Sequence, residues 1–151
     1  AFAHHFATHD AAVALTQYRR HFRPSRWRKT PYAVLAVAAV PADSDAEAEQ
    51  LASSYDLNRL RREHGQYLPL ASPEEALAYP YTAPDRARLV RYRDKVFVGS
   101  PATVRARLDP LIAACEADEV MVITPVFDHA ARKHSYGLLA RAFDLKAPLA
   151  A

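Results

Sequence analysis

The sequence lacks the marks of several protein classes. Its single cysteine, Cys115, cannot form an internal disulfide, so nothing indicates an oxidising compartment. No apolar run approaches the roughly 18–20 residues that are needed to cross a bilayer. The first residues, AFAHH, show no basic stretch followed by an apolar stretch, as a signal peptide would. These absences predict a soluble, cytoplasmic protein with no membrane partner.

Nucleic-acid and metal motifs are also missing. Basic residues concentrate at 19–29 and 86–95, but apolar residues compatible with a helix interrupt both clusters. No zinc-finger, RNA-recognition or basic-zipper pattern accompanies them, so solvated helix faces explain the clusters better and we expect no nucleic-acid partner. His4, His5 and His9 lie near the N-terminus, but no Cys, Asp or second histidine pair follows at a ligand spacing. We therefore predict no metal site.

Three apolar runs have the character of β-strands. They occupy residues 1–6, 32–40 and 119–124, and each is followed by a helical pattern. The two longer runs are continuous rather than alternating, which is typical of strands covered on both faces. Alternation of strand and helix favours right-handed crossovers onto a parallel sheet. We predict an α/β fold whose three strands run parallel in that spatial order, with helices packed on one side.

Capping residues mark the expected helix starts. Asp10 and Ser44 precede the first two helical patterns, and Ser100 followed by Pro101 marks the sharpest start. Pro110 lies inside the helix that follows and should kink it or divide it in two.

The stretch between the second and third predicted strands is less regular. Residues 67–84 hold four prolines and three tyrosines without an apolar period, which predicts a long mobile loop that could cover an active-site mouth. Residues 86–97 are expected to be partly helical.

Four segments match, in order along the chain, motifs of a single family. Residues 2–6 (FAHHF) are followed by FRPS at 22–25, by VFVGSPATV at 96–104 with ADEVMV at 117–122, and by the stretch 128–136. The sequence thereby resembles the bacterial luciferase-like, flavin-dependent monooxygenases. In that family the first segment is the sixth barrel strand, and the "ADE" stretch forms the last strand.

The resemblance implies a (β/α)8 TIM barrel. A complete barrel typically needs about 200–250 residues, so the 151 residues would form a single, incomplete domain of about three C-terminal strand–helix units. The family's five earlier strands are missing, as is the glycine-serine loop that helps to hold the FMN phosphate. We therefore expect a C-terminal fragment that is inactive alone and associates, perhaps as a homo-oligomer, through its open sheet edges.

The resemblance also implies an oxidoreductase that acts as a flavoprotein. Such a monooxygenase takes reduced FMN from a separate flavin reductase and uses O2 to oxidise a small organic substrate such as an aldehyde. The cofactor carries the chemistry, while the protein orients the reactants and keeps the site dry. The alternative is a non-catalytic half-barrel that binds a flavin-like ligand or pairs with another chain.

Candidate site residues follow from the rule that barrel chemistry lies at the C-terminal ends of the strands. By position, His4 and His5 are the candidate catalytic residues, and Phe6, Thr124 and Phe127 are the candidate cofactor-binding residues. Adjacent strand residues point to opposite faces, so one histidine would face the barrel mouth and the other the helices. An imidazole there could orient a flavin or a substrate carbonyl, or exchange a proton. A hydrogen-bonded structural histidine is the alternative for each.

Some residues depart from the family pattern or favour structural roles. Glu116 stands where the family usually has glycine, so the helix before it needs a different cap. Asp128 could be catalytic, but the cap of the last helix is its commoner role. Cys115 falls on an apolar helix stripe and is expected in the core.

Overall fold

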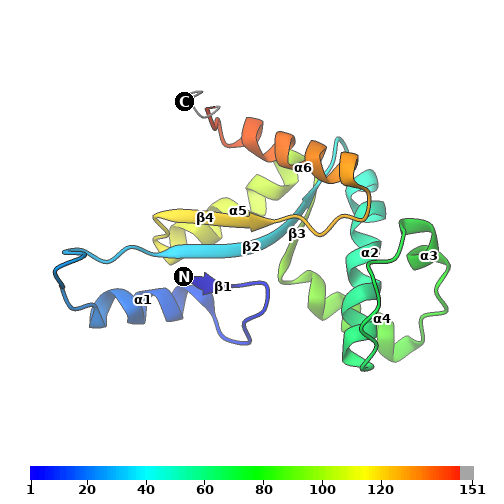
Figure 1. The fold of residues 1–151 in the computed structure, drawn as a ribbon, viewed down its shortest axis with the longest axis horizontal. Helices are drawn as coiled ribbons and strands as arrows, with labels where there is room; N and C mark the ends of the chain where they lie inside the picture. The colour runs from blue at the N-terminus through cyan, green and yellow to red at the C-terminus, as the bar shows by residue number, and fades with distance from the viewer. Residues whose placement is uncertain (147–151) are drawn as a thin grey trace.

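A parallel β-sheet with helices on both faces forms the centre of the computed structural model, which describes residues 1–146 (Figure 1). Within these residues, no helix combines the length and the apolar character that crossing a membrane requires. The elements in chain order are β1 (Phe2–Ala3), α1 (Ala11–His21), β2 (Val34–Pro41), α2 (Asp45–Glu63), α3 (Pro73–Ala78), α4 (Ala83–Arg93), β3 (Val96–Gly99), α5 (Pro101–Cys115), β4 (Glu119–Ile123) and α6 (His129–Ala142).

Strand β2 is the hub of the sheet. Strand β4 pairs with it along one edge, from Val34 opposite Glu119 to Ala38 opposite Ile123. Its other edge is shared: β1 lies opposite Leu35 at one end, and β3 follows from Ala38 onward. All pairs are parallel, so the predicted direction and spatial order of the three strands are confirmed.

Alternate residues of β2 pack against different helices. One set, with Leu35 and Val37, is buried in a cluster with residues of α1, α5 and α6. The other, with Ala38 and Val40, packs against α2. The prediction of helices on one side is therefore wrong. A physical reason is that α2 presents small residues, such as Ala52, to the last half of β2 and can lie close to it.

The face covered by α2 stays partly open along β4. Glu119, Met121 and Ile123 share this face, and all three are exposed; Met121 keeps 54% of its surface in solvent. An apolar row of this kind on a strand is normally covered by other parts of a protein.

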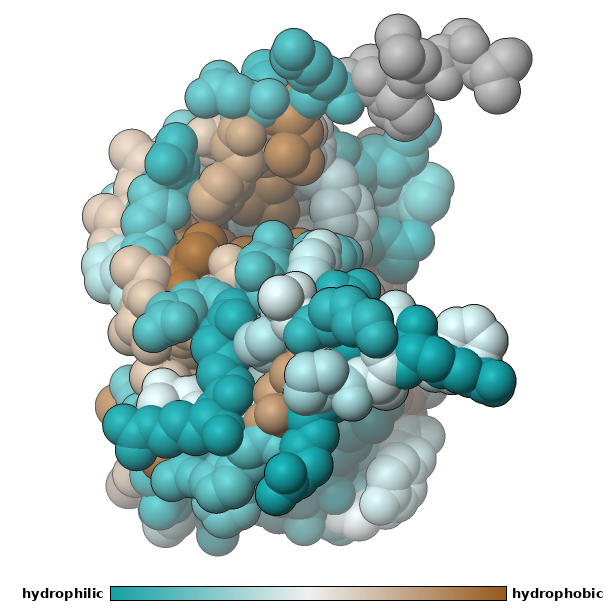
Figure 2. All heavy atoms as spheres, turned by 90° about the vertical axis from the view of Figure 1, so that its left-hand side faces the viewer, coloured by the Kyte–Doolittle hydropathy of each residue, from teal (hydrophilic) through white to brown (hydrophobic). Residues whose placement is uncertain are grey.

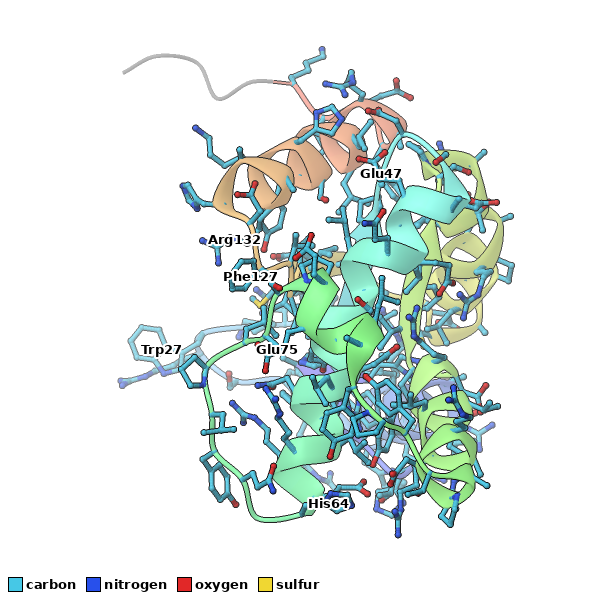
Figure 3. All side chains as sticks on the ribbon, turned by 90° about the vertical axis from the view of Figure 1, so that its right-hand side faces the viewer. Trp27, Glu47, His64, Glu75, Phe127 and Arg132 are labelled. Atoms are coloured by element: carbon cyan, nitrogen blue, oxygen red, sulfur yellow. The ribbon has the colours of Figure 1, made fainter. Side chains whose placement is uncertain are left out.

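The connection between α1 and β2 projects from the molecule. Figure 2 looks onto this end, where the connection forms a mostly hydrophilic arm. Trp27 is 81% exposed and points away from the rest of the chain (Figure 3). The Arg26 guanidinium lies 4.3 Å from the centre of its ring.

Residues 67–84 are more ordered than predicted. They contain α3 and the start of α4, because two of the four prolines occupy the first turn of a helix. Ser72 caps α3 ahead of Pro73, and Thr82 forms a capping box at α4 ahead of Pro84. Proline in the first turn loses no helical hydrogen bond, so these prolines begin helices rather than excluding them.

Two further expectations need correction. Helix α4 ends at Arg93, and the buried strand β3 follows, a strand that the sequence pattern did not predict. Helix α5 begins at its Ser100 cap as predicted but runs undivided past Pro110. Because Pro110 and Ala106, four residues earlier, are exposed, water can bind the carbonyl group that lost its partner.

Helix α5 ends without glycine. Glu116 adopts the left-handed conformation itself, with φ 45° and ψ 44°, and its N–H donates to carbonyl oxygens of the last turn. Arg19 of α1 donates to the Glu116 carbonyl and forms an ion pair with Asp118 at 2.8 Å. The expected caps at Asp10, Ser44 and Asp128 are present.

Candidate functional site

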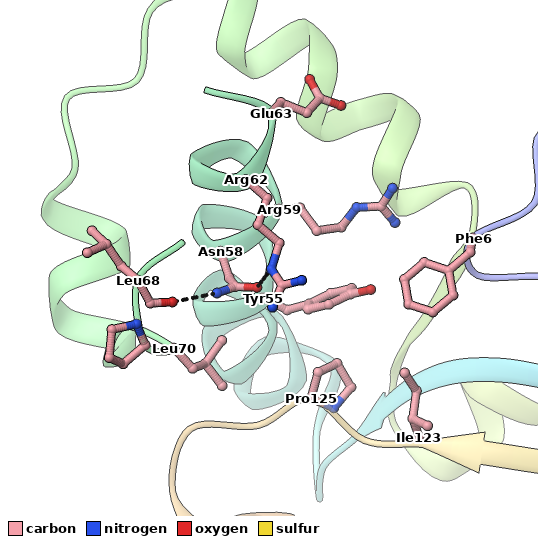
Figure 4. A pocket seen from close by; sticks show the side chains of 11 residues that line it. Phe6, Tyr55, Asn58, Arg59, Arg62, Glu63, Leu68, Leu70, Ile123 and Pro125 are labelled. Carbon is pink, nitrogen blue, oxygen red and sulfur yellow. Dashed lines mark hydrogen bonds between the residues drawn. The ribbon is translucent and has the colours of Figure 1, made fainter. Parts of the chain in front are cut away.

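The C-terminal ends of β1 and β4 open into a pocket against α2 (Figure 4). Its volume of about 620 Å³ lies in the range of small-molecule sites. Eleven residues line it: Phe6, Tyr55, Asn58, Arg59, Arg62, Glu63, Leu68, Pro69, Leu70, Ile123 and Pro125.

One wall of this pocket is polar and belongs to α2. Tyr55, Asn58, Arg59 and Arg62 recur at intervals of three and four residues, which places them on one side of the helix. Nε of Arg62 donates to Oδ1 of Asn58 at 3.2 Å, and the Asn58 amide donates to the Leu68 carbonyl at 3.4 Å. The side chain of Asn58 thus ties Arg62 and the following loop to the helix.

Arg59 links α2 to the end of β1. Its Nη1 donates to the His5 carbonyl at 3.3 Å, and its guanidinium lies 4.5 Å from the ring centre of Tyr92. Burial and the neighbouring Glu63 raise the pKa of Tyr92 to about 12, so the ring stays neutral beneath the cation. Arg59 is therefore held in place without a carboxylate.

The opposite wall is apolar. Phe6 is 72% exposed, and its ring centre lies 4.2 Å from that of His5. Ile123 and Pro125 contribute from the end of β4, and Leu68 and Leu70 from the loop after α2. The pocket can thus contact the apolar part of a ligand on one side and its polar groups on the other.

The two candidate catalytic histidines lie in a turn. The predicted strand at residues 1–6 covers only Phe2–Ala3, because the Phe6 N–H already donates back to the Ala3 carbonyl. The backbone N–H of His4 and Nδ1 of His5 both lie within hydrogen-bond distance of the Ala36 carbonyl oxygen, at 2.8 and 3.2 Å.

Neither histidine lines the pocket. The ring of His4 lies 6.2 Å from that of Phe97, in the cluster on the helix side, while His5 packs against Phe6. Both side chains are buried, and only the backbone carbonyl of His5 reaches the arginine wall, through Arg59. Their catalytic role stays a prediction.

Burial makes His4 a pH-sensitive point. Its Nδ1 has no hydrogen-bond partner, and burial, helped by Lys95 and His5, lowers its pKa below the ordinary 6.5. The unfolded chain then binds a proton that the folded chain does not, so stability should fall as the pH drops below 6.5. We expect His4→Phe, which keeps a ring near Phe97, to lose less stability than the parent between pH 7.5 and 5.5 in urea unfolding.

The control for this prediction replaces an exposed histidine. The variant His9→Gln should follow the parent's pH dependence. A His4→Phe protein with the same pH dependence as the parent would rule out His4 as the sensitive group.

Thr124 and Phe127 lie outside the pocket lining. Thr124 is buried; its backbone N–H donates to the Tyr136 hydroxyl at 3.1 Å, and its Oγ1 has no partner. It stands between Ile123 and Pro125, which do line the pocket. Phe127 is half exposed. Among the five candidates, only Phe6 lines the pocket.

The polar wall was missed at the sequence level. The usable signal was the spacing of Tyr55, Asn58, Arg59 and Arg62 on a capped helix, within the run NRLRR. Only the observed crossing of α2 over the strand ends shows that this side faces a pocket.

Comparison with known proteins gives consistent similarities. The chain is 39% identical over 142 residues to the uncharacterized protein YceB of Bacillus subtilis, covering 94% of the chain and 43% of that protein. It is 33% identical over 149 residues to a luciferase-like monooxygenase of Escherichia coli K12, covering 99% of the chain and 44% of that protein. No family model matches.

A solved structure resembles this fold. The crystal structure of apo-MsnO8 matches with a TM-score of 0.84 and 29% identity, over 95% of this chain and 44% of that one. The chain spans less than half the length of the curated relatives it matches. Over almost its whole length, this α/β chain is similar to part of a protein named luciferase-like monooxygenase, as the sequence motifs predicted.

Proposed function

We propose that this chain is the C-terminal part of a (β/α)8 barrel in a flavin-dependent, luciferase-like monooxygenase. The observation that carries the proposal is the pocket at the C-terminal ends of parallel strands, between the arginine wall of α2 and the apolar wall around Phe6. Active sites of such barrels lie at this end of the strands. The similarity to a luciferase-like monooxygenase over 149 residues supports the same function.

The open sheet face supports a larger barrel. Met121 and Ile123 expose apolar surface on the face of β4 that no helix covers. The remaining strands of a longer barrel would cover this face. The match to less than half of each relative supports the same arrangement.

The pocket fits a flavin in size and in donor chemistry. Its aromatic side chains, Phe6 and Tyr55, suit a planar ring system, and the guanidinium groups of Arg59 and Arg62 suit carbonyl or phosphate oxygens. Reduced FMN, supplied by a separate reductase, would provide the redox chemistry with O2 on a small organic substrate such as an aldehyde. The residues of this chain would orient the reactants and exclude water.

Oxygen consumption by the full-length gene product tests the proposal. We expect turnover of decanal to require both reduced FMN and O2, and Phe6→Ala to lower kcat/KM by about 10-fold because an apolar wall is lost. Arg91→Gln, on the exposed side of α4, is the matched control and should leave kcat/KM unchanged.

Two outcomes would contradict the proposal. One is the absence of flavin-dependent oxygen consumption with every aldehyde, ketone and sulfonate tried. The other is tight FMN binding by a monodisperse protein of these 151 residues alone, without turnover, which would favour the half-barrel alternative.

A further inference from the structure

The two pocket arginines stand out by their lack of a carboxylate partner. Arg61, which lies between them in the sequence, pairs with Glu75 at 2.6 Å, and Arg93 of α4 pairs with Asp56 at 2.7 Å. Within residues 1–146, neither Arg59 nor Arg62 lies within 4.0 Å of a carboxylate oxygen. The α2 wall therefore carries uncompensated positive charge.

The acidic residue in the lining does not remove this charge. Glu63 lies at the end of α2, and its carboxylate is 3.8 Å from Nε of Arg88 on α4. Arg88 and Glu63 thus compensate each other. The pocket keeps the two charges of Arg59 and Arg62 without an internal counterion.

Most hydrogen-bond donors of these arginines are unused. A guanidinium has five N–H donors, and Arg59 uses one on the His5 carbonyl while Arg62 uses its Nε on Asn58. The Tyr55 hydroxyl between them makes no hydrogen bond within the described residues. Figure 4 shows these three side chains extending from α2 into the pocket.

Arg62 is positioned to bind an oxyanion. Its contact with Asn58, which also holds the Leu68 carbonyl, fixes the guanidinium while both terminal nitrogens stay free. A planar fork held in this way loses little freedom when it binds a carboxylate or sulfonate. The wall opposite, with Phe6, Ile123 and Pro125, has no group that could bind such an anion.

We propose that the organic substrate of this site is amphipathic, with a carboxylate or sulfonate headgroup at Arg59 and Arg62 and an apolar body along Phe6, Ile123 and Pro125. The assignment rests on the proposed function for the statement that the bound molecule is the substrate. The headgroup preference itself rests on the pocket alone.

Calorimetric titration of the full-length protein tests the headgroup. The probes are decanoate, decanesulfonate, decanol and decylamine, which share an apolar body and differ at one end. We expect decanoate or decanesulfonate to bind at least about 10-fold more tightly than decanol, since a charge-assisted hydrogen bond is worth that much. Decylamine should bind most weakly.

Variants locate the contact. Arg62→Gln should weaken binding of the tighter anion by about 10-fold or more and leave decanol unchanged, while Arg62→Lys should keep part of the affinity. The control Arg91→Gln removes one exposed charge from α4 and should change neither. Comparing the two anions decides between a carboxylate and a sulfonate.

Three results would overturn the inference. Decanol could bind as tightly as both anions; Arg62→Gln and Arg62→Lys could weaken decanol and anions equally; or Arg62→Gln could weaken FMN but not riboflavin, which would assign Arg62 to the flavin phosphate. Turnover of decanal by the same variants separates this inference from the proposed function. Flavin-dependent turnover without an anion preference refutes the headgroup alone, whereas an anion preference without turnover refutes the monooxygenase.

Discussion

Replacing Gly99 with alanine should lower the free energy of unfolding by about 3 kcal/mol, the sum of a strained backbone and a steric overlap. Gly99 has φ 143°, a value that residues with a side chain rarely adopt. A Cβ there would lie 2.6 Å from Cγ2 of Thr103 and 2.9 Å from Oδ1 of Asp45. Neither neighbour can move freely, because Thr103 bonds Ser100 at 3.0 Å and Asp45 accepts the Ser100 N–H.

The other glycines supply matched controls for this change. Gly137→Ala lies in α6 with its nearest atom 3.5 Å away, and should stabilise the protein by up to about 1 kcal/mol. Gly65→Ala, with φ 74° in open space, should cost only about 1 kcal/mol of backbone strain. Urea unfolding of the three variants is the measurement, and equal changes in all three would refute the steric argument.

Replacing Arg93 with methionine should lower the free energy of unfolding by about 3 kcal/mol at neutral pH, the lower end for breaking a buried ion pair. Arg93 grips Asp56 through two nitrogens, at 2.7 and 2.9 Å, and also reaches Glu49 at 3.1 Å. Asp56 is buried at the joint between α2 and α4, so its carboxylate would lose its counterion without gaining water. Arg91→Met, on the exposed side of α4, is the control.

The loss should depend on pH. Burial raises the pKa of Asp56 above 3.8 even though Arg93 opposes this, and removal of Arg93 should raise the pKa further. A carboxyl whose folded pKa is raised destabilises the fold as the pH rises through that pKa, and a protonated carboxyl needs no counterion. The deficit of Arg93→Met should therefore be smaller at pH 5 than at pH 7.5, and Asp56→Asn should restore part of it. A deficit independent of pH would indicate lost packing of the arginine stem instead.

The strand pattern and the helix caps could be predicted from local chemistry. Apolar runs gave the parallel order of β1, β2 and β4, and Asp10, Ser44, Ser100 and Asp128 all cap the helices expected of them. These signals depend on a few neighbouring residues, so a single sequence contains them. The partial barrel and the roles of the candidate site residues stay predictions.

Tertiary features were beyond the sequence pattern. Strand β3 has only four residues directly after a helix, and the burial that makes it a strand comes from α2 and α5. The arginine wall has the composition of a solvated helix face, and only the position of α2 over the strand ends turns Arg59 and Arg62 toward a pocket. Spacing shows which residues share a side of a helix but not what that side meets.

The central place of β2 governs the order in which the sheet can assemble. Every strand pair includes β2, and each partner lies far from it in the sequence, so no hairpin can form first and serve as a template. Such distant pairings close large loops before they gain contacts, which slows folding. During synthesis, β2 would emerge with only the two-residue β1 to pair with, and would wait with an open edge until β4 leaves the ribosome. Protecting that apolar edge in the nascent chain then falls to α2, the helix that follows β2 directly and packs against it.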